Sequence, residues 1–313
     1  MLWIKENYPE VWKKASCFGH SNTFMAKWLS GQFAIDPSSA SLTALYNTVA
    51  NDLAWNGDIA GAFGVSVGRL PKLIWPLESS GRMLPLRAKE LGFKKEPPVV
   101  IGGNDAVLAA YSAGVKAPGD LINVNGTCEI TLVCLPKCFP STHYNIRAHV
   151  IPNCWLTLSV MNAGGKAHEW FKNMFCNEMS DEDFYKRFVS DTIDQRLERQ
   201  SSVTYLPCLM GSRYSSELLK AEFTGLTQQS TREGLLAAMV RGLCNYQKEH
   251  IDEIGLKVPL RERIYVTGGA NMPTVLNAKK RWMRDCRYEY REQSSMKGAA
   301  MLGYKHLREC AHR

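Results

Sequence analysis

The chain has 313 residues, of which 45% are hydrophobic and 22% charged, as in an ordinary globular protein with two domains or one very large one. Its formal net charge is +8, but acids are interspersed among the basic residues, which argues against a nucleic-acid partner and suits an anionic ligand such as a nucleotide. No apolar run reaches the ~20 residues of a membrane helix, and the first residues do not form a signal peptide, so we expect a cytoplasmic protein without a membrane partner.

The 10 cysteines are scattered and contain no C-x-x-C pair. The nearest approach to a cluster is Cys134 and Cys138 with His143 and His149. Reduced cysteines packed as small hydrophobic residues explain this distribution better than disulfides or zinc do. We therefore predict no metal site built from these side chains.

Helix signals dominate the first hundred residues. The segment 24–29 predicts a helix that ends at Ser30 and Gly31. Asp36, followed by a proline and serines, begins a second helical stretch with the chemistry of a helix cap.

The segment 97–129 carries the clearest functional pattern. A short apolar strand at 99–101 leads to Asp105 at the start of a helix, and a second strand, 121–125, leads to Gly126 and Thr127. A carboxylate at one junction, and a hydroxyl beside flexible backbone at the other, are what phosphoryl transfer needs. On spacing alone, an acid that simply caps the helix and an ordinary hairpin glycine after the second strand are the commoner explanation.

The rest of the chain predicts a second α/β unit. Strands are expected at 129–135 and 155–161, a polar connection between them at 137–153, and a helix after Gly164 and Gly165. A long helix over 232–254 precedes a strand at 264–266, whose following glycines allow close approach to a flat ligand. The composition shift at 114–119 predicts a boundary between units 1–115 and 116–313.

These motifs, in this order, resemble the FGGY carbohydrate kinases. The resemblance rests on GGNDAVLAAYSAG, NVNGTCE, the Pro207, Gly211 and Arg213 pattern, and GGAN, and it runs from the first residues nearly to the last. It implies an α/β, actin-like ATPase (ribonuclease H-like) fold with two lobes. Residues 1–115 would belong to the sugar-binding lobe and 116–313 to the nucleotide-binding lobe.

The resemblance also implies a function and a set of site residues. The protein would be an ATP- and Mg²⁺-dependent kinase acting on a small sugar, a ketose such as xylulose, with Asp105 as base and sugar contact and Asp36 in the sugar cleft. Lys166 could add positive charge near the phosphates. The residues implied in nucleotide binding are Gly126, Thr127, Gly165, Glu169, Gly268, Gly269, Ala270 and Asn271.

The beginning of the chain matches only the end of the family's first signature, at Trp3, Ile4, Glu6 and Asn7. We therefore expect the first lobe to be incomplete and to lack the phosphate-binding D-x-G-T turn of these kinases. One alternative is an inactive relic that binds nucleotide, sugar or another chain, including a second copy of itself. Another is a different actin-fold ATPase such as a chaperone, although the segment 29–41 favours the kinases.

Overall fold

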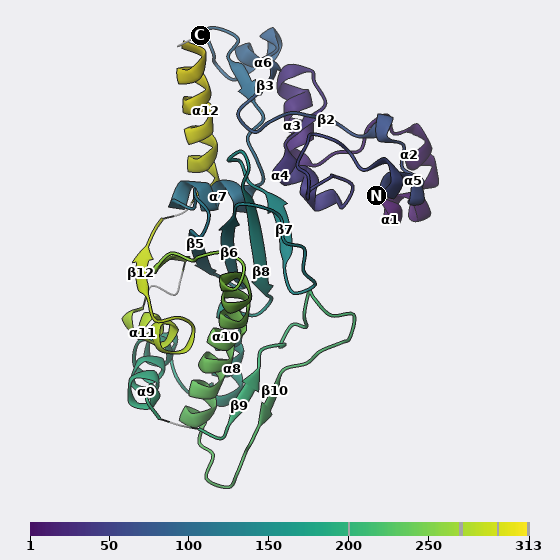
Figure 1. Ribbon diagram of the computed structural model, residues 1–313. Coiled ribbons are helices and arrows are strands. Elements are labelled where there is room, and N and C mark those ends of the chain that lie inside the picture. Colours follow the sequence, from purple (N-terminus) through teal and green to yellow (C-terminus); the bar gives the residue numbers. More distant parts are fainter. Residues whose placement is uncertain (200, 269–271, 293, 312–313) are drawn as a thin grey trace.

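The computed structural model describes residues 1–199, 201–268, 272–292 and 294–311. At its centre is a six-stranded sheet with the order β12-β11-β5-β6-β8-β7 (Figure 1). The strands are β5 (Leu121–Asn125), β6 (Glu129–Leu135), β7 (Asn145–Ala148), β8 (Trp155–Met161), β11 (Arg263–Gly268) and β12 (Arg287–Tyr290).

The sheet mixes parallel and antiparallel pairs. Strands β5, β11 and β12 are parallel, whereas β6 is antiparallel to both β5 and β8, and β7 is antiparallel to β8. In chain order the five strands other than β7 are arranged 3-2-1-4-5, as in the ribonuclease H-like sheet that the sequence predicted.

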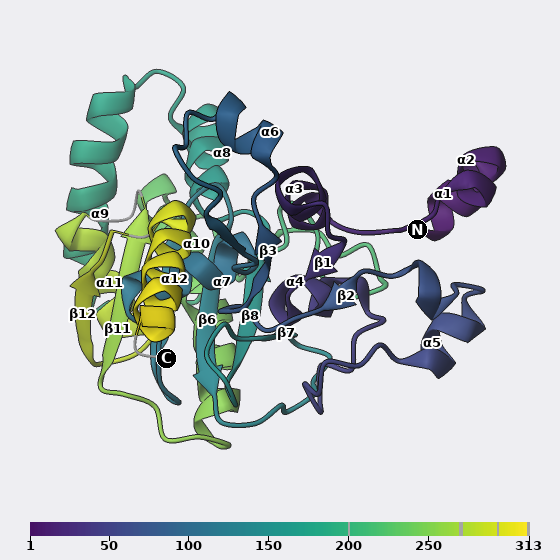
Figure 2. The same ribbon diagram turned by 90° about the horizontal axis from the view of Figure 1, so that it is seen from above.

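Helices cover both faces of this sheet (Figures 1 and 2). Successive residues of β5 point to opposite faces, so Leu121 packs in the core beneath α10 while Ile122 packs against α7 and α12. One face carries α7 (Asp105–Ala113) and α12 (Ser295–Ala311). The other carries α8 (Gly165–Phe175), a π-helical turn (Asp183–Phe188), α9 (Val189–Arg196), α10 (Arg232–Gly255) and α11 (Pro273–Trp282), with the ribbon of β9 (Thr204–Leu206) and β10 (Glu222–Thr224) beside them.

The N-terminal part forms smaller elements with cores of their own. It extends from the sheet at the upper right of Figure 1. Its helices are α1 (Leu2–Asn7), α2 (Pro9–Lys14), α3 (Ser21–Ser30), α4 (Pro37–Ala40), α5 (Gly57–Ala62) and α6 (Pro85–Glu90), with 3₁₀ turns at Ser41–Thr43 and Val67–Arg69. Its strands pair as β1 (Ala34–Ile35) with β2 (Lys72–Leu73) and β3 (Ser79–Arg82) with β4 (Pro98–Val100).

Most predicted elements are present with small shifts at their ends. The helix predicted over 24–29 begins earlier, at Ser21, and ends as expected before Gly31, whose φ of 77° closes it. The polar connection predicted over 137–153 is wrong in one respect, because it contains strand β7. No helix among the described residues is long and apolar enough to cross a membrane. The proposed division at residue 115 stays a prediction.

Candidate functional site

Two glycine-containing loops meet at one end of the sheet. Gly126 and Thr127 form the turn between β5 and β6, and their carbonyl groups accept hydrogen bonds from the amides of Gly165 and Gly164, both at 2.9 Å. A Cβ on Gly165 would lie 2.8 Å from the Gly126 oxygen, so a side chain there would push the loops apart. The glycines predicted from sequence are therefore brought together, and their first role is to allow this close contact.

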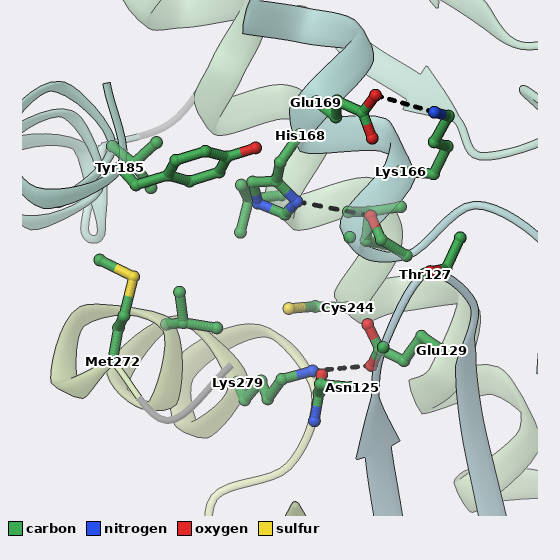
Figure 3. A pocket seen from close by; sticks show the side chains of 17 residues that line it. Asn125, Thr127, Glu129, Lys166, His168, Glu169, Tyr185, Cys244, Met272 and Lys279 are labelled. Carbon is green, nitrogen blue, oxygen red and sulfur yellow. Dashed lines mark hydrogen bonds and ion pairs between the residues drawn. The ribbon is translucent and has the colours of Figure 1, made fainter. Parts of the chain in front are cut away.

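A cavity of about 310 Å³ opens beside the two loops (Figure 3). One part is polar and includes the Thr127 hydroxyl, the Lys166 amine and the glycine backbone. The other part is apolar, as a site for a flat heterocycle would be. Its apolar lining comes from Tyr185, Val189, Val240, Leu243, Met272 and Val275. This donor set and shape fit a nucleotide, with the base in the apolar part and the phosphates at the loops.

The polar rim of this cavity is formed by the start of α8. Lys166 and Glu169 both line the cavity and form an ion pair of 2.8 Å, with side chains 45% and 51% exposed. His168 also lines it, and the Gly164 carbonyl lies 3.5 Å from its Nδ1. Its Nε2 is buried and has no partner among the described residues, and burial lowers the pKa of the imidazole. The start of α8 thus combines a cation, an anion and a neutral imidazole.

A buried ion pair forms the floor of the cavity beside the two glycine loops. The Lys279 amine lies 2.7 Å from Oε1 of Glu129, and the two side chains are only 3% and 8% exposed. Asn123 donates to the same carboxylate oxygen at 2.9 Å and to Thr131 at 3.0 Å. Neither Glu129 nor Lys279 was predicted as a site residue. Two signals were available: an acid two residues after the Gly-Thr pair, and a lysine at helical spacing from the buried Trp282 and Met283.

Gly268 ends strand β11 next to β5. Its φ is 88°, and a Cβ there would lie 2.0 Å from the Asn125 carbonyl oxygen. Glycine is required for strand packing at this point, and the residue is not part of the cavity lining described above. Gly269, Ala270 and Asn271, predicted to hold the adenosine, lie outside the described residues.

Asp105 lines a second, separate cavity of about 620 Å³. Asn104, rather than Asp105, is the N-cap of α7, because its Oδ1 accepts from the Ala106 amide. Asp105 is exposed, and its Oδ1 also accepts from that amide at 2.7 Å. The remaining polar lining suits sugar hydroxyls and comes from His20, Ser21, Asn22, Ser39, Gly103, Asn104 and Ser295.

Asp36 is fully buried and lines neither cavity. Its carboxylate caps α4 by accepting from the amides of Ser38 and Ser39, at 2.7 and 3.1 Å, and it also accepts from Asn22 at 3.0 Å. Burial raises its pKa, against the lowering effect of these hydrogen bonds. The Ser38 hydroxyl, which donates to Asp36, accepts from the Asn104 amide at 2.8 Å. Asp36 therefore supports, through Ser38 and Asn104, the second cavity that Asp105 lines. Its predicted contact with the sugar stays a prediction.

Metal ligands do not gather in the described part of the chain, where no three His, Cys, Asp or Glu side chains form a metal-binding group. The carboxylates of Glu129 and Glu169 in the nucleotide cavity are each paired with a lysine. With both carboxylates paired, we derive no step through a divalent metal.

Comparison with known proteins supports one family. Residues 1–112 match the model of the N-terminal domain of the FGGY family of carbohydrate kinases. Nearly the whole chain, 99%, aligns with 63% of the xylulose kinase of Bacillus subtilis at 25% identity. These matches support the resemblance to the FGGY carbohydrate kinases that the sequence predicted.

Other relatives of this chain differ in name. It is 29% identical over 184 residues to the autoinducer-2 kinase of Yersinia enterocolitica, covering 57% of the chain and 34% of that protein. The crystal structure of xylulose kinase from Rhodospirillum rubrum matches 97% of the chain and 61% of its own length with a TM-score of 0.86 at 18% identity. That likeness confirms the actin-like ATPase fold. The chain thus spans less than two thirds of the length of these relatives.

Proposed function

We propose that this chain carries out, or forms the larger part of a protein that carries out, ATP-dependent phosphorylation of a sugar hydroxyl. The observation that carries the proposal is the pairing of two cavities: one holds the Gly126 and Thr127 turn against the start of α8, and the other holds an exposed carboxylate, Asp105. The first suits a nucleotide, and the second suits a polyhydroxy acceptor.

The chemistry follows from the positions of these groups. Asp105 takes the proton of the sugar hydroxyl, whose oxygen then attacks the terminal phosphorus of ATP. The bond between that phosphorus and the bridging oxygen breaks, and the electron pair leaves with ADP. Thr127, whose Oγ1 has no hydrogen-bond partner among the described residues, donates to a phosphate oxygen. In this family ATP is the phosphoryl donor.

For the acceptor we propose a ketose such as xylulose. The support is that relatives covering most of the chain, by sequence and by structure, are named xylulose kinases. The autoinducer-2 kinases align over only part of the chain. Autoinducer-2 is therefore the second acceptor to test. The magnesium dependence, the cytoplasmic location and pairing with a second copy stay predictions.

The experiment combines binding with turnover on the full chain. Calorimetry measures ATP and ADP affinity, and a coupled assay measures ADP release with xylulose, ribulose, gluconate, glycerol and autoinducer-2. Asp105→Asn is expected to lower sugar-dependent turnover by ~100- to 10,000-fold while ATP affinity changes less than twofold.

Two results would count against the kinase. Turnover of Asp105→Asn within threefold of the parent would remove that residue from the role of base. Nucleotide binding without turnover on any acceptor would favour the second reading, an inactive protein that retains its nucleotide cavity.

A further inference from the structure

The nucleotide cavity and the cavity lined by Asp105 share no lining residue. Two arginines are hydrogen-bonded to residues at or near the two cavities. Arg147 projects from β7, the edge strand that the sequence did not predict, and Arg213 lies in the segment between β9 and β10.

Arg147 is attached to the acceptor side. Its Nη1 donates to Oδ1 of Asn104 at 2.7 Å, and Asn104 directly precedes Asp105. Its Nε is buried and has no partner in the described part of the chain, where no carboxylate oxygen lies within 4.0 Å of the guanidinium either. A half-buried guanidinium with five donors and one partner has donors left to bind an anion.

Arg213 is attached to the nucleotide side. Its Nε donates to Oδ1 of Asn162 at 2.7 Å, and Asn162 lies two residues before Gly164, which pairs with Thr127. Arg213 is exposed and, within the described ranges, forms no ion pair with a carboxylate. The loop that carries it is anchored by the Tyr214 hydroxyl, which donates to the Leu158 carbonyl at 2.9 Å.

The three charges are close enough to influence one another. Burial is the main cause that lowers the pKa of Arg147, while Asp105 raises it and Arg213 lowers it further. A carboxylate and two cations therefore lie within electrostatic reach of one another, with only Arg147 partly buried.

Resting on the kinase function proposed above, we propose that Arg147, assisted by Arg213, contacts the terminal phosphate of ATP during its direct transfer to the acceptor hydroxyl that Asp105 deprotonates. A planar guanidinium suits this task because it offers two parallel donors to a phosphate and keeps its charge at any working pH. It would neutralise charge that develops on the phosphoryl oxygens during transfer.

The test compares two nucleotides that differ only at the third phosphate position, ADP and the imido analogue AMP-PNP, by calorimetry on the full chain. Arg147→Met is expected to weaken AMP-PNP binding by about 10- to 100-fold, as for loss of a hydrogen bond to a charged group, and to leave ADP affinity within twofold. Arg147→Lys should recover part of the lost AMP-PNP affinity, because lysine keeps the positive charge but lacks the two parallel donors of the guanidinium.

Arg82→Met is the matched control, because Arg82 is an exposed arginine of β3 whose loss changes the net charge equally, whereas Arg147 is hydrogen-bonded to the cavity residue Asn104. The affinities for ADP and AMP-PNP should both stay at the parent's values in this control variant. Far-UV circular dichroism and urea unfolding show whether Arg147→Met is folded, and if it is not, the Arg147→Lys comparison decides.

The outcomes separate this inference from the proposed function. If the parent binds neither nucleotide, the kinase proposal fails and the inference falls with it. If the parent binds both and the Arg147 variants keep the parent's ratio of AMP-PNP to ADP affinity, the inference alone is overturned.

Discussion

At the residue scale, the buried Glu129 and Lys279 pair is the most consequential feature of the nucleotide cavity. Removing two charges from water is costly, and the cost is offset here by an ion pair of 2.7 Å and a hydrogen bond from Asn123. The pair ties the first residue of β6 to the second turn of α11, and so fixes the cavity floor (Figure 3).

Replacing only one partner leaves the other charge buried without compensation. Lys279→Met is therefore expected to lower the free energy of unfolding by about 3–5 kcal/mol, measured by urea denaturation. Lys280→Met is the control, because Lys280 is the next residue of the same helix, 61% exposed, and its loss should cost less than about 1 kcal/mol.

A double variant checks the reason for the loss. Glu129→Leu combined with Lys279→Met removes both charges, and should be more stable than Lys279→Met alone. If the double variant is instead less stable than Lys279→Met alone, the loss of packing volume, rather than the unpaired carboxylate, explains the single variant.

At the scale of elements, the position of α12 depends on one glycine. Gly298 is where α12 crosses α7, and a Cβ there would lie 2.2 Å from the Leu108 carbonyl oxygen. The backbone of α7 cannot move away easily, because α7 is packed on the sheet and carries Asp105 at its start. The helix contact and the acceptor cavity are thus coupled through α7.

Gly298→Ala should accordingly destabilise the protein by about 1–3 kcal/mol through overpacking, again measured by urea unfolding. Gly303→Ala on the same helix has open space around its Cβ and should be neutral or stabilising by up to about 1 kcal/mol, because alanine favours helix. Equal effects of the two substitutions would contradict the close crossing of α12 and α7.

At the scale of the whole molecule, two buried histidines link folding to pH. Burial lowers the pKa of His149 and of His250 to about 4. His149 contacts the Val115 carbonyl at 3.0 Å, and His250 contacts the Thr157 hydroxyl at 3.1 Å, so both are held neutral in the interior. In the unfolded chain their pKa is near ~6.5.

The sign of the pH effect follows from this difference. Below pH ~6.5 the unfolded chain binds protons that the folded protein does not bind, so stability falls as the pH falls toward 4, by up to about 1.4 kcal/mol per pH unit for each histidine. Urea unfolding at pH 7.5, 6 and 5 measures the slope, and the His149→Gln, His250→Gln double variant should flatten it. A stability that does not change between pH 7.5 and 5 would show that these side chains are not held neutral.

The sequence by itself determined most of the elements and the resemblance to the FGGY kinases, because those depend on local pattern. Alternating and helical apolar spacing predicted β5, β8, α7 and α10, and the glycine-marked junctions predicted which residues form the turn at Gly126 and Thr127. The sequence also indicated that Asp36 has the chemistry of a helix cap, which the structure confirms.

Only the tertiary structure decided which distant residues meet. Lys279 pairs with Glu129 across 150 positions, and Arg147 reaches Asn104 from a strand hidden in a polar segment, and no local pattern encodes either contact. Sequence periodicity reports which side of an element is buried, whereas partners across the fold are set by strand order and helix crossing. For that reason the sequence placed Asp105 and Thr127 in one expected reaction, but only the packing of the elements showed that they line two different cavities.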